Sequence, residues 1–394
     1  MINRSDYNWG VPEVESIEKY GDGGLYPVHI DDRFQDGRYQ ILNKLGFGSF
    51  STVWAAWDHR NKSRVSLKVI RAENSENNLE LRILQRIQQG TTQHPGHKYL
   101  PRLLDHFYEG SAERRNLFLV LELLGPNVND VMRFRPKQRF NLSSSCRRIS
   151  KQLLLAVDCL HSLGIVHGDI YLRNILYRLP DNNELNLTEV IKGGVSRKDG
   201  APLEEGLPRY LVEPLDLTRQ RKRLEFEKLN HIQLIDFSSS FFESEPPESI
   251  YTPIPFSPPE LIFGKPLDKK IDIWNLGCTT FSIATGGDLF IEWFDKRHII
   301  PQIYDVIGES SAPWLLSAIF DAVQNQDWKD LPVVTDEKLS LYFDSGHSAI
   351  TSKKEKRRVG ALKRYLRKAL IPDPSKRPAT EELLADGWVQ IEAD

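Results

Sequence analysis

Cysteine is scarce in this chain of 394 residues, which contains only Cys146, Cys159 and Cys278. An odd number of cysteines without paired spacing argues against a disulfide framework and against a cysteine-based zinc site. Such sparse use of cysteine is typical of proteins in a reducing compartment.

Long hydrophobic runs are missing as well. The first ten residues are polar and lack the apolar centre of a signal peptide. No apolar run is long enough to span a bilayer. We therefore expect a protein without a membrane anchor, located in the cytoplasm, the nucleus or both.

An excess of charge of one sign is also absent. Lys and Arg together number 52, Asp and Glu together number 54, and the formal net charge is −2. This balance predicts no overall attraction to nucleic acid or to a membrane surface. Hydrophobic residues make up 40% and charged residues 27% of the chain, as in globular proteins. The length exceeds what one hydrophobic core usually supports, so we expect two lobes or two domains.

The predicted elements place a sheet before a set of helices. Short segments rich in β-branched and aromatic residues predict strands, and apolar residues at helical spacing predict helices. The predicted strands cover residues 39–42, 51–57, 65–70 and 117–124, and the clearest predicted helices cover residues 79–87, 149–163 and 358–370. This order indicates an α+β protein whose two lobes join near residues 122–126.

The chain is expected to divide into an arm and two lobes. Residues 1–37 are rich in Gly, Asp and Pro and predict an irregular arm. The sheet-rich lobe then covers residues 38–124, and the helical lobe covers residues 125–392. Within the helical lobe, residues 180–234 are polar with little apolar periodicity, which is typical of an insertion. The basic run at residues 353–358 predicts the solvated start of a helix, with a nuclear localisation signal as the alternative.

A glycine-rich turn lies between the first two strands. Gly46 and Gly48 leave room for backbone N–H groups to approach phosphate oxygens closely. No helix follows, which excludes a dinucleotide-binding motif. The turn alone is a weak signal, and an ordinary hairpin is the alternative.

A lysine follows on a strand. Lys68 stands among Val65, Leu67 and Val69, and we expect it to bind the α- and β-phosphates of a nucleotide while a helix carboxylate holds it. Glu80 is the candidate because it lies in the amphipathic segment. The alternative carboxylates are those of Glu73 and Glu76, and the alternative role is an outward-pointing lysine on an edge strand.

Two further segments carry oxygen ligands. In residues 167–176, Asp169 and Asn174 are five positions apart, a spacing at which Asp169 would orient a hydroxyl and Asn174 would help to hold Mg²⁺. Asp236 follows the apolar strand at residues 232–235 and precedes Phe237, which suits a second magnesium ligand. A simple turn aspartate is the alternative for Asp236.

The order of these motifs resembles the signature of eukaryotic protein kinases. Three further residues extend the resemblance: Glu260 in a Ser-Pro-Pro-Glu motif, Asp272 in a motif of the large lobe, and Arg377 as the expected partner of Glu260. The resemblance covers roughly residues 38–392. It implies a bilobal kinase fold, with a five-stranded antiparallel sheet and one main helix before a helical lobe, and it implies ATP and Mg²⁺ as cofactors.

The chain is similar in particular to the SR-protein kinases. The segments that carry this similarity are residues 26–30, 37–39, 50–54 and 122–125, together with an insertion before Asp236. The resemblance implies a serine/threonine kinase that acts on protein substrates, Arg/Ser-rich splicing factors among them, and so a link to mRNA processing. We expect a monomer that does not bind nucleic acid directly.

The same resemblance implies which residues contact the nucleotide. Leu121 would be the gatekeeper, and the backbone of Glu122 and Leu124 would bind adenine. The full implied set is Leu45, Gly46, Phe47, Gly48, Ser49, Phe50, Val53, Ser66, Lys68, Leu121, Glu122, Leu124 and Leu176.

Four positions depart from the general kinase pattern. Gly168 replaces the arginine that receives an activation-loop phosphate, so activity should not need that phosphate. Tyr171 replaces a lysine that neutralises the transferring phosphoryl group. Ser238 replaces the glycine after Phe237, and Ser66 replaces a small apolar residue near adenine. Acidic residues are interleaved with basic ones at 288–305, so an acidic docking groove is not evident.

Two alternatives therefore stay open. One is a non-catalytic scaffold with a kinase fold. The other is a small-molecule phosphotransferase, which shares the His-Gly-Asp pattern but is not expected to contain Glu260, Asp272 and Arg377.

Overall fold

The computed structural model describes residues 2–390 apart from 22–23, 91–92, 112–113, 135–143, 181–184, 291–301 and 303–352. The chain forms two compact units. Unit 1 comprises residues 1–88, 101–126 and 178–229, and unit 2 comprises residues 89–100, 127–177 and 230–394. Each unit is described by itself below.

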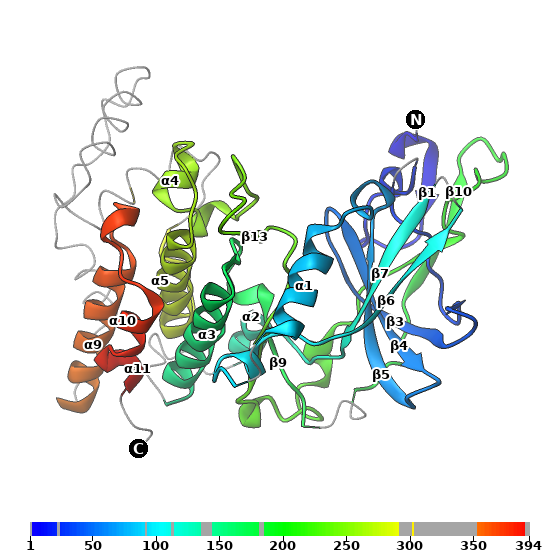
Figure 1. The fold of residues 1–394 in the computed structure, drawn as a ribbon. Helices are drawn as coiled ribbons and strands as arrows, with labels where there is room; N and C mark the ends of the chain where they lie inside the picture. The colour runs from blue at the N-terminus through cyan, green and yellow to red at the C-terminus, as the bar shows by residue number, and fades with distance from the viewer. Residues whose placement is uncertain are drawn as a thin grey trace, which may run out of the picture. The chain divides into compact units, whose positions relative to one another are not determined.

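Unit 1 contains a six-stranded antiparallel sheet in the order β2-β3-β4-β5-β7-β6 (Figure 1). Its strands are β2 (Arg33–Phe34), β3 (Tyr39–Phe47), β4 (Ser51–Asp58), β5 (Ser63–Ile70), β6 (Leu103–Gly110) and β7 (Arg115–Glu122). The family resemblance implies five strands. The sixth is β2, because the arm folds back through a tight turn and pairs Phe34 with Tyr39.

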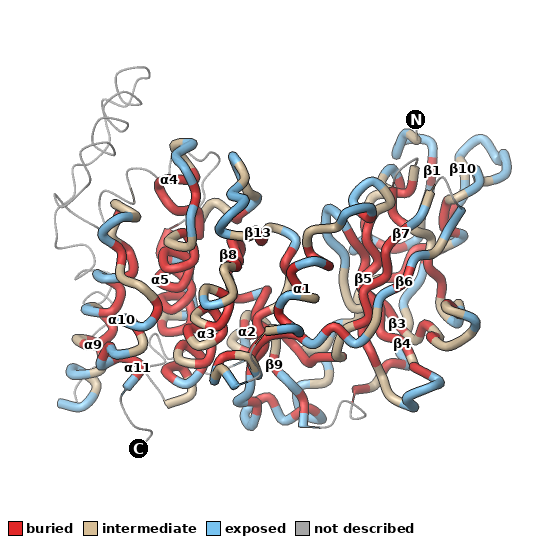
Figure 2. Tube along the Cα trace, in the orientation of Figure 1, coloured by how far each residue is buried: buried red, intermediate tan, exposed pale blue. Residues whose placement is uncertain are grey.

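Helix α1 (Leu79–Gln89) follows β5 and buries an apolar stripe formed by Leu81, Ile83, Leu84 and Ile87. The sheet itself buries a core of aliphatic and aromatic side chains. In that core the rings of Phe107 and Phe118 stack with centroids 5.0 Å apart. Figure 2 shows buried residues along β5 and β7, which agrees with strands that pack on a hydrophobic core.

A second, three-stranded sheet joins the arm to the insertion. It consists of β1 (Tyr7–Trp9), β10 (Lys192–Arg197) and β11 (Tyr210–Val212), in the order β1-β10-β11. The expectation of an irregular arm is therefore corrected. The segment at 178–229, which the sequence places in the helical lobe, clusters with unit 1 because its strand β10 pairs with the arm.

Short 3₁₀ helices complete the described part of unit 1. They are η1 (Arg4–Asp6), η2 (Ile17–Tyr20), η3 (Ala72–Asn74), η7 (Leu217–Gln220) and η8 (Phe226–Lys228).

Unit 2 is mainly helical. Its described helices are α2 (Val128–Arg133), α3 (Ser144–Ser162), α4 (Pro259–Ile262), α5 (Lys270–Thr285), α9 (Lys353–Ala369), α10 (Thr380–Leu384) and α11 (Gly387–Gln390), with 3₁₀ helices η4 (His97–Tyr99), η5 (Leu172–Asn174), η9 (Ile254–Phe256) and η12 (Pro374–Lys376). Every residue of α5 from Ile271 to Ala284 is buried, since α3 and α9 both pack against this helix (Figures 1 and 2). The basic run at 353–358 forms the largely exposed start of α9, as predicted.

Two strand pairs in unit 2 hold its loops. Strand β8 (Ile165–Val166) pairs with β13 (Phe241–Phe242), and β9 (Ile175–Tyr177) pairs with β12 (Ile232–Leu234). The candidate site residues of unit 2 lie at the ends of these short strands. Within the described residues, no helix combines the length and apolar character needed to cross a membrane.

Candidate active site

Lys68 and Glu80 form a buried ion pair inside unit 1. The Lys68 Nζ lies 2.6 Å from one carboxylate oxygen of Glu80 and 2.8 Å from the other. Their side chains are 9% and 5% exposed. The two alternative carboxylates have other partners: Glu73 pairs with Arg71 and Glu76 with Arg115. Strand β5 and helix α1 therefore supply the pair that the sequence predicts.

The sheet register brings the glycine-rich turn into line with Lys68. Gly46 lies opposite Val53 across β3 and β4, and Val53 lies opposite Lys68 across β4 and β5. The N–H of Gly48 donates to the carbonyl of Ser51 at 2.8 Å and closes the turn. An exposed turn that is linked through the sheet to a buried lysine is suited to binding a phosphate group.

The other implied nucleotide contacts fall on both units. In unit 1, Ser66 lies opposite Leu121, which is partly exposed, as is Glu122, whereas Leu124 is buried. The Glu122 carboxylate accepts hydrogen bonds from two arginines, Arg102 and Arg178. Leu45, Gly46 and Val53 are partly exposed, while Phe47, Gly48, Ser49 and Phe50 are exposed. In unit 2, Leu176 is a partly exposed residue of β9.

Asp169 and Asn174 are joined within the loop that follows β8. The Asn174 Nδ2 donates to the Asp169 carboxylate at 2.8 Å and to the Asp169 carbonyl at 2.9 Å. Both side chains are buried, and η5 forms the turn between them. The amide thereby fixes the direction of the carboxylate.

Asp236 is brought beside this loop by the pairing of β9 with β12. One residue before it, the N–H of Ile235 donates to the Asn174 carbonyl at 2.9 Å. Asp236 itself is partly exposed and has a left-handed backbone, with φ of 67°. A carboxylate and an amide oxygen are the hard donors that Mg²⁺ prefers, and Mg²⁺ usually takes few protein ligands beside substrate phosphates. The donor set formed by Asn174 and Asp236 therefore fits this ion.

Asp272 anchors the same loop from helix α5. Its carboxylate has no exposed surface and accepts from the backbone N–H of His167 at 2.9 Å and of Gly168 at 2.8 Å. The His161 ring nitrogen lies 2.9 Å from the same carboxylate. The two residues before Asp169 are thus tied to a buried helix.

Arg377 and Glu260 form a second buried ion pair, in unit 2. The guanidinium donates to the two Glu260 oxygens at 2.5 and 2.7 Å. It also donates to the carbonyls of Ile371, Pro372 and Lys270. All five guanidinium N–H groups therefore have acceptors, as a fully buried arginine requires.

A family model described as the protein kinase domain matches residues 39–192 and 224–389. The chain belongs to the protein kinase family. Members of this family use ATP with Mg²⁺.

Named relatives are serine/threonine kinases and other protein kinases. Protein kinase dsk1 of Schizosaccharomyces pombe is 38% identical over 166 residues, which are 41% of this chain and 30% of dsk1. Serine/threonine-protein kinase SRPK of Physarum polycephalum is 28% identical over 308 residues, which are 71% of this chain and 67% of that protein. A serine/threonine protein kinase of Aspergillus fumigatus is 25% identical over 397 residues, 96% of this chain and 90% of that protein.

Gly168 departs from the usual kinase arginine for a steric reason. Its backbone is left-handed, with φ of 78°, and a Cβ atom there would lie 2.8 Å from the Ile250 side chain and 2.9 Å from the Ser239 carbonyl. The Thr252 hydroxyl donates to the Gly168 carbonyl at 2.6 Å, and the Ser239 hydroxyl donates to the Tyr251 carbonyl at 2.8 Å. This part of the activation segment is held by direct contacts at the place where a phosphate-binding arginine would stand.

Tyr171 replaces the usual kinase lysine with a neutral group. Burial, followed by the negative charges of Asp169 and Asp236, raises the pKa of Tyr171 to about 12. Its ring lies 5.7 Å from that of Phe256. The phenol keeps its proton at neutral pH and supplies a hydrogen-bond donor without a positive charge.

Three buried polar residues of unit 1 are missed by the motif comparison. Glu15 in the arm forms a buried ion pair with Lys44 of β3, and Asn43 beside it binds carbonyls of the insertion. The available signal is weak, because Lys44 follows Asn43 just beyond the strand predicted at residues 39–42, whereas Lys68 stands among apolar residues of a predicted strand.

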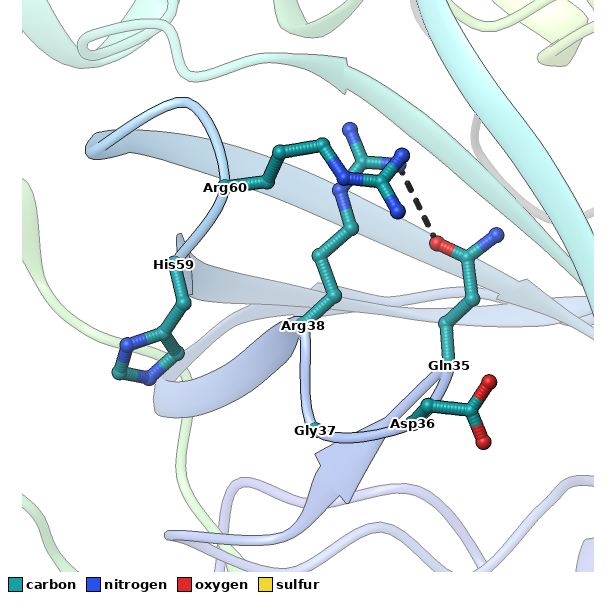
Figure 3. Close-up of a pocket in the computed structure, with 6 residues that line it drawn as sticks. All are labelled: Gln35, Asp36, Gly37, Arg38, His59 and Arg60. Carbon is teal, nitrogen blue, oxygen red and sulfur yellow. Dashed lines mark hydrogen bonds between the residues drawn. The ribbon is translucent and has the colours of Figure 1, made fainter.

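A separate pocket of about 470 Å³ lies at the β2–β3 turn of unit 1. Figure 3 shows the residues that line this pocket, which are Gln35, Asp36, Gly37, Arg38, His59 and Arg60. None of them is a predicted site residue. The Arg38 guanidinium is held by Asp58 and Asp105.

The Glu260 ion pair should be essential for the stability of unit 2. We expect Glu260→Gln to reduce the free energy of unfolding by about 3–5 kcal/mol, because it leaves the buried guanidinium without its counter-charge. Urea unfolding measures this change. The matched control is Glu225→Gln, which removes an exposed ion pair with Lys228 and should leave stability unchanged. Equal losses in the free energy of unfolding for the two substitutions would contradict a stabilising role of the buried Glu260 ion pair.

Two glycines allow backbone strain at Gly168 to be separated from its steric contacts. Gly164 has φ of 69° and nothing within 4 Å of an added Cβ, whereas Gly168 has φ of 78° and two close contacts. Gly164→Ala should cost about 1–2 kcal/mol from left-handed strain alone. Gly168→Ala should cost clearly more in the same urea titration. Similar costs for both would show that Ile250 and Ser239 yield freely.

Proposed function

We propose that this chain is an active serine/threonine protein kinase that transfers the γ-phosphoryl group of ATP to hydroxyl groups of protein substrates. The observation that carries the proposal is the buried ion pair between Lys68 and Glu80, because kinase activity depends on this pair being formed. The bond between Asn174 and Asp169 supports it from unit 2.

The proposed roles follow from the chemistry of each side chain. Lys68, oriented by Glu80, provides positive charge for the α- and β-phosphates. The carboxylate of Asp169, with its direction set by Asn174, accepts the hydrogen bond of the substrate hydroxyl and orients that oxygen for in-line attack. When bound, Mg²⁺ neutralises charge on the transferred phosphoryl group, and Asn174 and Asp236 are the residues that would hold it.

Tyr171 sets an expectation about rate. A neutral phenol in place of an ammonium group removes one electrostatic contribution to the transition state. The kinase should therefore be slower than one with lysine there, but the positions of Asp169, Asn174 and Lys68 do not depend on that charge.

The substrate class is proposed as Arg/Ser-rich proteins. The support is the similarity to a relative named SRPK and the sequence features shared with SR-protein kinases. Of the acidic residues that could dock such a substrate, Asp288 accepts from Ser282, whereas Glu292, Asp295 and Asp305 lie outside the described residues. We further propose a monomer that acts in the cytoplasm, the nucleus or both, without direct nucleic-acid binding.

Asp169→Asn tests the chemistry without removing the nucleotide site. Phosphate transfer to an Arg/Ser-repeat peptide should fall at least a hundredfold, because the hydroxyl loses its orienting carboxylate. Mg²⁺-ATP should still raise the melting temperature of the variant as it does that of the wild type. A generic basic peptide serves as the specificity control. No transfer by the wild type, together with a thermal shift, would favour a non-catalytic scaffold.

Activity should not require phosphorylation of the activation segment. The bonds from Thr252 to Gly168 and from Ser239 to Tyr251 order the segment without a phosphate. A phosphatase-treated sample, checked by intact mass, should keep its rate on the Arg/Ser-repeat peptide. Loss of that rate, with recovery after rephosphorylation, would contradict the prediction.

A further inference from the structure

The arm and the insertion form one layer of unit 1. Strand β1 pairs with β10 so that Tyr7 lies opposite Arg197. Side chains from both segments share a small buried core of Tyr7, Val11, Ile17, Tyr20, Leu25, Val195, Leu207 and Leu211. An arm with its own core and sheet partner is fixed in place.

Both parts of this layer bind strand β3 just before the glycine-rich turn. The Asn43 side chain donates to the carbonyls of Leu187 and Glu189 in the insertion, at 3.1 and 2.7 Å. The N–H of Leu215 donates to the Lys44 carbonyl at 2.8 Å. The register of β3 against β4 shifts just before Asn43 and just after Lys44. Such bulges redirect side chains, here at the two residues that the layer binds.

The strongest contact of the layer is a buried charge cluster. The Lys44 ammonium pairs with the Glu15 carboxylate, and their side chains are 0% and 1% exposed. The Tyr20 hydroxyl donates to the same carboxylate. Removing two charges from water is costly, so a buried pair is weak evidence for stability, and in some proteins its contribution is a unique geometry. The geometry held here is that of β3.

Lys44 of this cluster and Lys19 of the arm both contact the glycine-rich turn. The Lys44 Nζ lies 5.2 Å from the centroid of the Phe47 ring, within the range of a cation–π contact. The Lys19 Nζ, also in the arm, donates to the Gly48 carbonyl at 3.2 Å. Lys44 and Lys19 therefore contact two consecutive residues of an exposed turn, the ring of Phe47 and the carbonyl of Gly48.

We propose that Glu15 and Lys44 are positioning residues for the nucleotide. Glu15 orients Lys44, and Lys44 together with Lys19 holds the backbone at residues 46–50 where its N–H groups meet phosphate. The arm is then part of the ATP site, although it precedes the kinase fold. The inference rests on the proposed kinase function, because that function identifies the phosphates of ATP as the ligand of the turn.

Hydrogen exchange and kinetics of Glu15→Gln in the full chain test this inference. Without nucleotide, amides at 46–50 should exchange faster than in the wild type, while those of β7 keep their protection. The KM for ATP should rise roughly tenfold, as expected when a binding group is slightly misplaced, and the KM for the peptide should not change. Glu13→Gln, an exposed change in the same arm, is the matched control and should behave as the wild type.

A triple variant covers the case in which Glu15→Gln does not fold. Glu15→Leu with Lys44→Met replaces the pair by apolar side chains of similar size, and Tyr20→Phe removes the hydroxyl that would otherwise lose its acceptor, a replacement that usually preserves stability. It should melt near the wild-type temperature yet keep the fast exchange at 46–50 and the raised KM for ATP. Wild-type exchange and KM in this variant would overturn the proposal. Failure of the wild type to bind Mg²⁺-ATP would count against the kinase function instead, and the exchange result would still decide whether the pair holds the turn.

Discussion

Asp272 has no exposed surface, and its carboxylate accepts hydrogen bonds from the N–H groups of His167 and Gly168. Those two residues lead directly into Asp169, so the helix that carries Asp272 holds the backbone from which the proposed reactive carboxylate extends. Helix α5 is buried along nearly its whole length and cannot shift without disturbing the core of unit 2. The chemistry of this unit thus depends on an anion that never meets solvent and bonds mainly to backbone groups.

The buried ion pairs of the two units differ in the bonding and flexibility of their cations. Arg377 has all five donors occupied, by Glu260 and by three carbonyls, and its planar guanidinium cannot change partners without leaving acceptors unmet. Lys68 is a point charge on a flexible stem, and it bonds the two oxygens of one carboxylate. The first pair is suited to fixing a structure, whereas the second is suited to a cation that also serves a phosphate.

Local patterns made much of this arrangement predictable. Asp169 and Asn174 occupy one loop at a fixed spacing, and strand β5 and helix α1 follow directly from apolar periodicity. The pairing of β1 with β10 was not predictable, because it joins two short segments that lie far apart in the sequence, one in the arm and one in the insertion. Strand β2 was missed for a related reason, since two residues carry no period and its hairpin depends on left-handed residues at Gln35 and Asp36.

Lys44 and Lys68 show where sequence reasoning stops. Both lysines lie in strands of the six-stranded sheet, and both are buried against a glutamate. Lys68 is recognisable because it stands among apolar residues of a predicted strand, and its partner lies twelve residues away on the next helix. The partner of Lys44 precedes it, in a segment with no regular period, so nothing in the sequence links the two. A lysine that is buried in a strand needs a counter-charge. Only the fold identifies which carboxylate supplies it, and whether the lysine contacts a ligand or holds the backbone that binds the ligand.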